Sequence, residues 1–237
     1  INTDNSFIFN SVSNIADKKS NLWQHFSGYE IETNKDFFDD QIFNLMDFDC
    51  EQKDNVHFFY TLPYSKTKAL IETTWVSDLN NSSVKDYDNQ LKDYIENNLK
   101  IKNYKINYKE TGAIPLFHPK YIKKLNQIEI GTAGGMTRLS TGYTFLNIQE
   151  QSRYIRKNIE KINEIKLFSI NNKYQFLDNI FLRVLQNNPE KMPSIFYKMF
   201  NSSPSTVINF LSNKSNLFED ISIISKMPKW IFLKQIF

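Results

Sequence analysis

The stretch EIGTAGGMTRLSTGY, residues 129–143, decides the fold prediction because it concentrates a residue that the rest of the chain avoids. The 237-residue chain has only six glycines. Four of the six lie in this stretch: Gly131, Gly134, Gly135 and Gly142. A short strand is predicted before it, at 126–131, and one long helix after it, from Tyr143 to about Ile165. The sequence therefore predicts a strand, a glycine loop and a helix in succession.

A glycine loop in this position has two explanations. Backbone without side chains can approach a ligand closely, and the start of the following helix favours an anion or an electron-rich ring. A tight turn that only packs the helix on the strand requires the same glycines. The spacing matches neither a GxGxxG dinucleotide fingerprint nor a GxxxxGK[ST] phosphate loop, so general motif rules name no ligand.

Composition and charge exclude several classes of protein. The chain is 41% apolar, with 20 Phe and 12 Tyr, and so can build a sizeable core. A net charge of +3 from 29 basic and 26 acidic residues is too balanced for a dedicated nucleic-acid binder. The single Cys50 excludes an intrachain disulfide and indicates a reducing compartment. His25, His57 and His118 are too far apart for a metal site, and we predict none and structural roles for all three.

The hydrophobic pattern changes along the chain from strands to helices. Val84, Tyr87, Leu91 and Tyr94 recur at helical spacing, which predicts a helix over 84–99 with Ser83 as its N-cap. No apolar run is long enough to span a membrane. The chain begins at Ile1 without a secretory signal, and we expect further sequence before it. Strands are predicted at 6–12 (buried), 22–33, 41–49, 55–62, 67–76, 104–116 and 126–131, with a hairpin joining 55–62 to 67–76 and helices after Gly142.

Glu72 is the acidic residue with the most unusual predicted surroundings. In ALIETTWV (69–76) the two faces of the strand alternate by twos, and both are rather apolar. Burial there raises the pKa of a carboxyl group and keeps it neutral, as a general acid requires. A Glu72 that pairs with Lys68, or that points to solvent at a sheet edge, fits the same pattern.

Several blocks resemble the lycopene cyclase family, in the family's order over nearly the whole chain. IGTAGGMTRLSTGYTF (130–145) is similar to its carboxy-terminal flavin-contacting motif, and FFYTLPYSKTKALIETTWVSD (58–78) to its E-x-T segment. LWQHFSGYEIET (22–33), FNLMDF (43–48) and ETGAIPL (110–116) resemble further motifs, and the tail from Phe181 fits bacterial members. The family's amino-terminal GxGxxG portion has no counterpart here, so the chain resembles the carboxy-terminal two-thirds of such an enzyme.

The resemblance implies an α/β (α+β) architecture, the FAD-dependent p-hydroxybenzoate-hydroxylase-like fold without its amino-terminal part. Residues 1–20 would end the FAD-binding core and 21–111 would form the substrate-binding β-sheet. Residues 112–170 would return to the FAD-binding domain with the glycine loop and long helix, and 171–237 would form a helical tail. Sequence alone leaves open whether these residues bind flavin without the missing portion.

The function that the resemblance implies is closure of the linear ends of lycopene into β-rings, with reduced FAD that NAD(P)H keeps reduced. Glu72 coincides with the family's catalytic acid. Asp47 matches a family position, either as a second polar group of the cavity or as a residue that hydrogen-bonds within the sheet. Glu110 precedes Gly112 and would line the same cavity. Trp75 and Phe59 are candidates for cation–π stabilisation. The flavin contacts would come from Gly131, Thr132, Ala133, Gly134, Gly135, Met136, Thr141 and Gly142.

Two alternatives to the β-cyclase remain open at this point. One is a related isoprenoid flavoenzyme, a geranylgeranyl reductase or another carotenoid cyclase. The other is a non-catalytic module that binds an apolar ligand or a membrane. The tail KMPKWIFLKQIF (226–237) mixes Trp, Phe and Lys as interfacial anchors do, which predicts contact with a membrane surface. We therefore expect a cytoplasmic, peripheral membrane protein.

Overall fold

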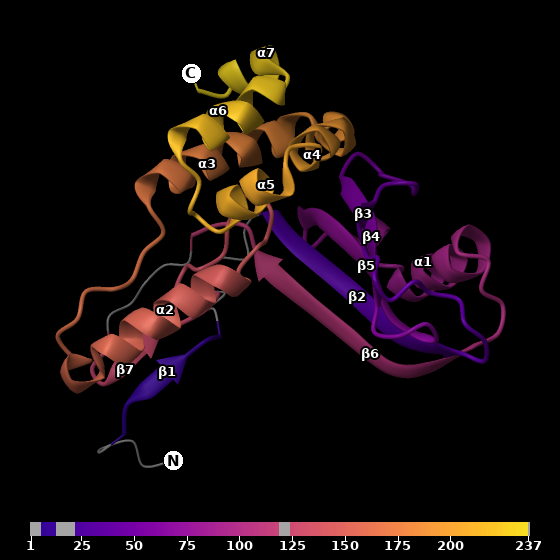
Figure 1. Ribbon diagram of the computed structural model, residues 1–237, viewed down its shortest axis with the longest axis horizontal. Coiled ribbons are helices and arrows are strands. Elements are labelled where there is room, and N and C mark those ends of the chain that lie inside the picture. The colour runs from indigo at the N-terminus through magenta and orange to yellow at the C-terminus, as the bar shows by residue number, and fades with distance from the viewer. Residues whose placement is uncertain (1–5, 13–21, 119–123, 237) are drawn as a thin grey trace. The chain divides into compact units, whose positions relative to one another are not determined.

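The structure is a computed structural model, and it describes residues 6–12, 22–118 and 124–236. The chain divides into two compact units, Ser20–Ile114 and the combination of Ile1–Lys19 with Pro115–Phe237. Each unit has its own secondary structure (Figure 1). Phe237 and parts of the segment predicted at 1–20 lie outside the described residues.

The first unit is built on a five-stranded sheet. Its spatial order is β3-β4-β5-β2-β6, and β5 is antiparallel to both of its neighbours, as the predicted hairpin requires. Val and Ile, with aromatic residues at alternate positions, give these segments their extended conformation. The strands are β2 (Leu22–Thr33), β3 (Asn44–Asp47), β4 (Val56–Pro63), β5 (Lys68–Asp78) and β6 (Tyr104–Pro115).

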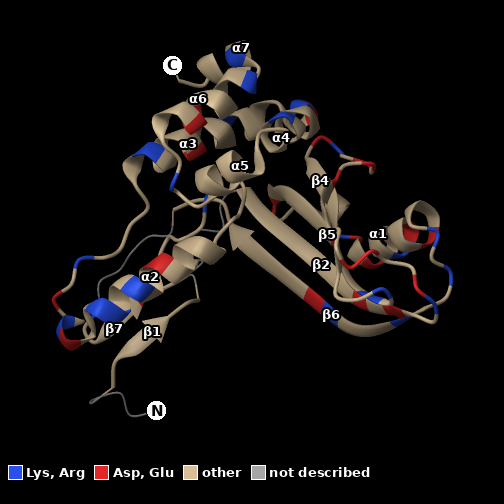
Figure 2. Cartoon of the chain, viewed as in Figure 1, with Lys and Arg blue, Asp and Glu red and all other residues tan. Residues whose placement is uncertain are grey.

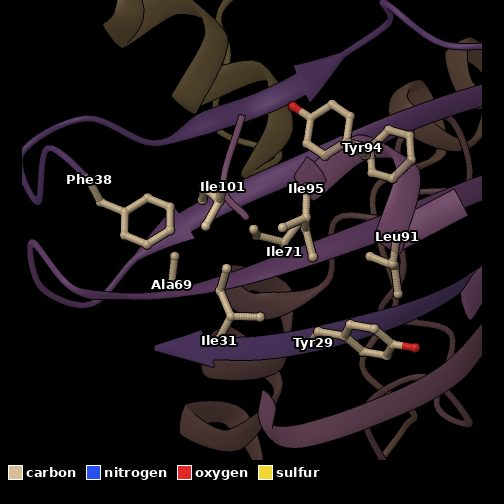
Figure 3. Close-up of a cluster of buried hydrophobic side chains, with 10 residues drawn as sticks. Tyr29, Ile31, Phe38, Ala69, Ile71, Leu91, Tyr94, Ile95 and Ile101 are labelled. Atoms are coloured by element: carbon tan, nitrogen blue, oxygen red, sulfur yellow. The ribbon is translucent and has the colours of Figure 1, made fainter. Parts of the chain in front are cut away.

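One face of this sheet carries the odd-numbered residues of β5 and is covered by helix. Ile71 and Ala69 of β5 pack with Leu91, Tyr94 and Ile95 in a single apolar core (Figure 3). Fully burying such a side chain contributes about 1.5–3 kcal/mol to the free energy of unfolding. Because the helix that carries Leu91 and the turn after it pack on this face, it forms the core of the unit.

The helical segment over this core is shorter and less regular than predicted. A 3-10 turn, Ser82–Val84, comes first because the Asn81 side chain accepts a hydrogen bond from the Ser83 amide. Helix α1 (Tyr87–Asp93) then begins after Asp86, and a π-helical turn, Tyr94–Asn98, completes it. The prediction of Ser83 as the N-cap was therefore wrong.

Two of the three histidines are buried in this unit as structural residues. His25 contacts the Tyr87 hydroxyl at 2.7 Å and the Ser77 hydroxyl at 2.8 Å. The His57 ring stacks on Trp75, with 3.8 Å between centroids. Burial lowers the pKa of both imidazoles to about 4, so both are neutral at pH 7.

The second unit contains a small parallel sheet and a group of helices. Strand β1 (Ile8–Asn10) pairs with β7 (Gln127–Glu129). The expectation that 6–12 is a buried strand was wrong, because Ile8 and Phe9 are exposed in this two-stranded sheet. Helix α2 (Phe145–Lys157) follows the glycine loop and is shorter than the helix predicted to run to about Ile165.

Five more helices make up the rest of the described chain. Ser203 caps α5 by accepting a hydrogen bond from the Thr206 amide, and Pro204 follows it at the first position of the helix. None of the helices in the described residues is both long and apolar enough to cross a bilayer. The helices are α3 (Asn172–Asn187), α4 (Met192–Phe200), α5 (Pro204–Leu211), α6 (Leu217–Lys226) and α7 (Lys229–Leu233).

Candidate functional site

Glu72 lies in the middle of β5, on the face of the sheet opposite the helix-covered core. The register places it between Tyr60 of β4 and Gly28 of β2. Its neighbours along the strand on the same face are Leu70 and Thr74. Glu72 is half-buried. Its position on this face therefore follows directly from the alternation in the sequence.

The Glu72 carboxyl has no cationic partner among the described residues. Lys68, the candidate partner in the sequence, instead contacts Glu32 at 3.5 Å. The one direct hydrogen bond to the Glu72 side chain comes from the Thr74 hydroxyl, at 2.7 Å. Burial raises the pKa of Glu72 to about 7, and the nearby Glu110 carboxyl adds to this shift, which the Thr74 bond partly opposes. A substantial fraction of Glu72 is therefore protonated at neutral pH.

Glu110 of β6 shares the face of Glu72. Gly28 separates the two, and a Cβ atom built on Gly28 would lie 3.3 Å from Glu110 Oε1 and 3.0 Å from the Leu70 side chain. A close approach is thus present at Gly28, and β2 and β5 pair continuously from Leu22 to Glu32. The absence of a side chain at Gly28 leaves room for the second carboxyl beside the first.

Aromatic rings surround the two carboxyl groups on this face. Tyr60 lies directly opposite Glu72, and its ring makes a T-shaped contact with Phe58 at 5.2 Å. The Phe26 ring lies over Gly112, where an added Cβ would come within 2.5 Å of it. Sequence reasoning missed these three aromatic residues, although their even numbers in register with Glu72 could have identified them.

Trp75, Phe59 and Asp47 are placed on the opposite face. Trp75 Nε1 donates to the Gln90 side chain at 2.9 Å, and Phe59 stacks on Tyr94 with 3.9 Å between ring centroids. Asp47 accepts a hydrogen bond from the Tyr94 hydroxyl at 2.7 Å. The structure therefore brings Glu72 and Glu110 together and separates these three residues from them.

The glycine loop in the second unit shows why each of its glycines is needed. Gly131, Gly135 and Gly142 have φ angles of +56°, +75° and +71°, which side-chain-bearing residues rarely adopt. At Gly134 a Cβ atom would lie 2.7 Å from the carbonyl oxygen of Glu129. The loop's own conformation therefore accounts for all four glycines.

The amides of the loop point mostly inward. Gly134, Gly135 and Met136 donate to the carbonyl oxygens of Ile130, Thr132 and Gly131, in that order. The Gly131 amide donates to the Gln151 side chain at 2.8 Å, and Met136 is fully buried with its carbonyl oxygen bonded to Asn147. Thr141 is half-buried, away from this turn, and its amide donates to Arg138. These bonds make the loop a preformed turn.

One side of the turn is open to a ligand. Ala133, Gly134 and Gly135 line a cavity of about 170 Å³ together with His118, Glu129, residues 167–170 and Gln175. No atom lies within 4 Å of the position of a Cβ on Gly135. A flat ring edge fits beside this exposed backbone, and the polar side chains of the lining fit the hydrogen-bonding atoms of such a ring, so the residues present are compatible with the flavin predicted here. Residues Ala133 to Gly135 would hold it through backbone contact.

A buried ion pair fixes the second half of the loop. Arg138 is fully buried, and its Nη2 lies 2.7 Å from Asp178 Oδ1 of α3. Asp178 also accepts hydrogen bonds from the Leu139 amide and the Ser140 hydroxyl. Sequence reasoning missed this pair, although an Asp among the apolar positions of a helix is a recognisable signal.

The fold of the chain is similar to that of solved structures. Over 93% of its length the chain is similar to a solved structure described as geranylgeranyl bacteriochlorophyll reductase-like, from Thermoplasma acidophilum, with a TM-score of 0.51 and 14% identity. The structure of a flavin-dependent brominase matches 90% of the chain with a TM-score of 0.47 and 14% identity. The chain spans 55% of the length of each. The similarity to the reductase-like structure concerns the fold, and the strands and helices of the chain give an α+β architecture, as predicted.

The sequence of the chain matches one family model over most of its length. The family model described as lycopene cyclase protein matches residues 5–235. The chain belongs to the lycopene cyclase family, as its motifs predicted. A comparison with curated proteins finds no match.

Proposed function

We propose that this chain carries the acid site of a lycopene β-cyclase and that Glu72 is its proton donor. The observation that carries the proposal is a half-buried carboxyl group without a cationic partner, with a pKa near 7, on a sheet face rich in aromatic rings. Family membership supports the substrate class, a linear polyene with isoprenoid ends. An alkene is a very weak base, so its donor must be neutral, close and shielded from water.

The reaction begins when the Glu72 O–H bond breaks and its proton forms a C–H bond at the terminal double bond. The next double bond of the polyene attacks the resulting cation and closes a six-membered ring. The Glu72 carboxylate then accepts a proton from a neighbouring carbon, which restores a double bond and returns Glu72 to its neutral form, so that substrate and product are isomers. Tyr60, Phe26 and Phe58 would stabilise the cation from the face of Glu72.

The cofactors of the proposal are FAD and NAD(P)H. Reduced flavin supplies an electron-rich ring that stabilises positive charge, and NAD(P)H keeps it reduced. Within this chain, the backbone of Ala133, Gly134 and Gly135 would hold the ring edge, and the Arg138–Asp178 pair would keep the loop in shape. We propose a peripheral membrane location, since the substrate dissolves in lipid.

The test is pigment analysis in cells that accumulate lycopene. The chain is expressed alone and together with an amino-terminal dinucleotide-binding portion, as wild type, Glu72→Gln and Glu30→Gln. Glu30 is a matched control because it lies on the same face of β2, opposite Leu70. We expect β-carotene from wild type and Glu30→Gln and only lycopene from Glu72→Gln at equal protein levels. Normal conversion by Glu72→Gln would remove this residue from the acid role.

A second candidate function is a reductase that acts on an isoprenoid chain. The similarity to the reductase-like structure from Thermoplasma acidophilum favours it over other flavin chemistries. A reductase consumes NADPH in proportion to product, whereas a cyclase needs it only to prime the flavin. The amount of NADPH consumed per molecule of product therefore distinguishes the two functions. For this chain we expect far less than one NADPH per product molecule, as for a cyclase.

A further inference from the structure

The helices at the end of the chain enclose an apolar groove that the proposed reaction does not use. It has a volume of about 460 Å³, within the range of about 300–1,000 Å³ that is typical of sites for small ligands. Its walls come from α3, α6 and α7, with Leu177, Ile180, Ile223 and Phe232 among the lining residues. The polar exceptions are Ser225 and Lys229. A hydrocarbon chain is the ligand that such walls favour.

The surface around the groove is apolar as well. Large side chains on α6 and α7 are exposed, including Phe218, Ile221, Ile224 and Leu233. Trp230 is 79% exposed, whereas Trp23 and Trp75 are 2% and 1% exposed. An apolar groove surrounded by exposed apolar residues differs from a closed ligand pocket, whose rim would be polar. The whole surface, and not the groove alone, therefore faces an apolar partner.

The charge of this surface is of one sign. From Ile221 to Ile236 the chain has three lysines, Lys226, Lys229 and Lys234, and no acidic residue. Figure 2 shows basic but no acidic residues on α7. No carboxylate of the described residues pairs with any of the three lysines.

The acidic residues of α3 and α6 do not line the groove. Asp178 and Asp220 are buried and paired with Arg138 and Lys173. Glu219, near the start of α6, accepts hydrogen bonds from the Asn216 amide and the Asn209 side chain. Of the described residues that line the groove, Lys229 is the charged one, and it is positive.

We propose that this surface docks the protein on an anionic lipid bilayer and that the groove takes hydrocarbon chains of the bilayer lipids. Exposed Trp with flanking Lys is typical of segments that lie in a membrane interface. A second copy of the chain fits less well, because a twofold contact would bring the same lysines together without acidic partners. The proposal extends the membrane part of the proposed function and does not depend on the cyclisation chemistry.

The first measurement is binding of the purified full chain to vesicles by flotation, with no polyene present. Vesicles of phosphatidylcholine alone are compared with vesicles in which phosphatidylglycerol replaces part of it. We expect binding to the anionic vesicles that weakens as salt increases. Replacing Lys226, Lys229 and Lys234 with Gln should weaken it about fivefold per lysine, or about 100-fold together. The control replaces Lys157, Lys161 and Lys166, a basic segment elsewhere in the unit, and should have no comparable effect.

Matched apolar variants test the surface itself. Ile224→Glu changes a residue that is 46% exposed and lines the groove. Ile159→Glu changes a residue that is 49% exposed but lies outside it. We expect Ile224→Glu to reduce vesicle binding at least tenfold and Ile159→Glu to leave it unchanged, with circular dichroism confirming that both variants are folded.

The fluorescence of Trp230 reports contact with hydrocarbon directly. Lipids brominated in their acyl chains should quench the emission of vesicle-bound protein, and Trp230→Phe should abolish this quenching because the other two tryptophans are buried. Three results would overturn the proposal: no binding to either kind of vesicle, binding with no quenching, or a dimer that forms through this surface in place of vesicle binding. Equal binding of a monomeric short-chain lipid or free fatty acid without vesicle binding would also overturn it, because the groove would then serve a soluble ligand.

Discussion

Replacing Glu72 with Gln should stabilise the protein at alkaline pH and leave its stability almost unchanged at acidic pH. Burial raises the pKa of Glu72 from 4.5 to about 7 in the folded protein. In the unfolded chain the carboxyl group ionises near its ordinary value. Between these two values the folded state therefore binds more protons than the unfolded state, and the free energy of unfolding falls as pH rises.

The size of the effect follows from the shift. Each unit of pKa difference corresponds to about 1.4 kcal/mol, so a shift from 4.5 to about 7 costs about 3 kcal/mol once Glu72 is ionised in both states. Below about pH 4.5 the protonated carboxyl group and the Gln amide are nearly isosteric, and the amide oxygen can still accept the Thr74 hydrogen bond. The gain from Glu72→Gln should thus rise from near zero to about 3 kcal/mol above pH 8.

The assay is urea unfolding of wild type and Glu72→Gln at a series of pH values from about 5 to about 9. His25 and His57 also titrate on unfolding, but both variants contain them, so their contribution cancels in the difference. A difference in unfolding free energy that does not change with pH would refute a raised pKa at Glu72. A Glu72→Gln variant that is destabilised at pH 8 would refute it equally.

Three further variants test the surroundings of the two sites. Glu110→Gln removes a negative charge that raises the pKa of Glu72, so the pH at which the Glu72→Gln gain is half complete should move down; an unchanged midpoint would place Glu110 too far away to matter. Asp178→Ala leaves the Arg138 charge buried and unpaired, which should lower the free energy of unfolding by about 3–5 kcal/mol in urea titrations, and a loss below 1 kcal/mol would contradict the buried pair. Gly134→Ala forces a Cβ against the Glu129 carbonyl oxygen and should cost about 1–3 kcal/mol in the same assay, whereas an unchanged midpoint would mean that the loop is looser than described.

The sequence predicted the sheet better than the helices, for physical reasons. The strand at 22–33 coincides with β2, in which every residue is buried or half-buried, as expected of an apolar run in the middle of a sheet. The helix start at Tyr143 was wrong by two residues, since Gly142 takes a positive φ and Thr144 is the residue that precedes the first helical turn. The ends of a helix depend on which of several neighbouring residues caps it, so a predicted end is commonly displaced by one or two residues.

The candidate site was predictable in part. The alternation by twos in 69–76 places Glu72 and Trp75 on opposite faces of the strand. The prediction that Trp75 lies beside the acid relied on its aromatic side chain and did not apply this alternation. The contact between Arg138 and Asp178 joins residues 40 positions apart; the sequence marks Asp178 as unusual among the apolar positions of its helix but does not indicate its partner. Features that depend on strand register could be read from the sequence, and those that depend on helix packing could not.

The cations whose ion pairs the structure describes are paired with carboxylates other than that of Glu72. Lys68 contacts Glu32, Lys109 contacts Asp88, and Arg138 forms an ion pair with Asp178. In the ion pairs that the structure describes, these cations therefore have partners other than Glu72. A single lysine beside Glu72 would lower its pKa and keep the carboxyl group ionised, whatever its burial. Burial is the largest cause of the raised pKa of Glu72, and the Glu110 carboxyl group adds to it, whereas a cation in the same place would oppose it. Burial and the neighbouring carboxyl group destabilise the folded protein when Glu72 is ionised, and they also keep Glu72 protonated, as the proposed donor to a weak base must be. The difference in unfolding free energy between wild type and Glu72→Gln therefore measures the raised pKa on which the proposed chemistry depends.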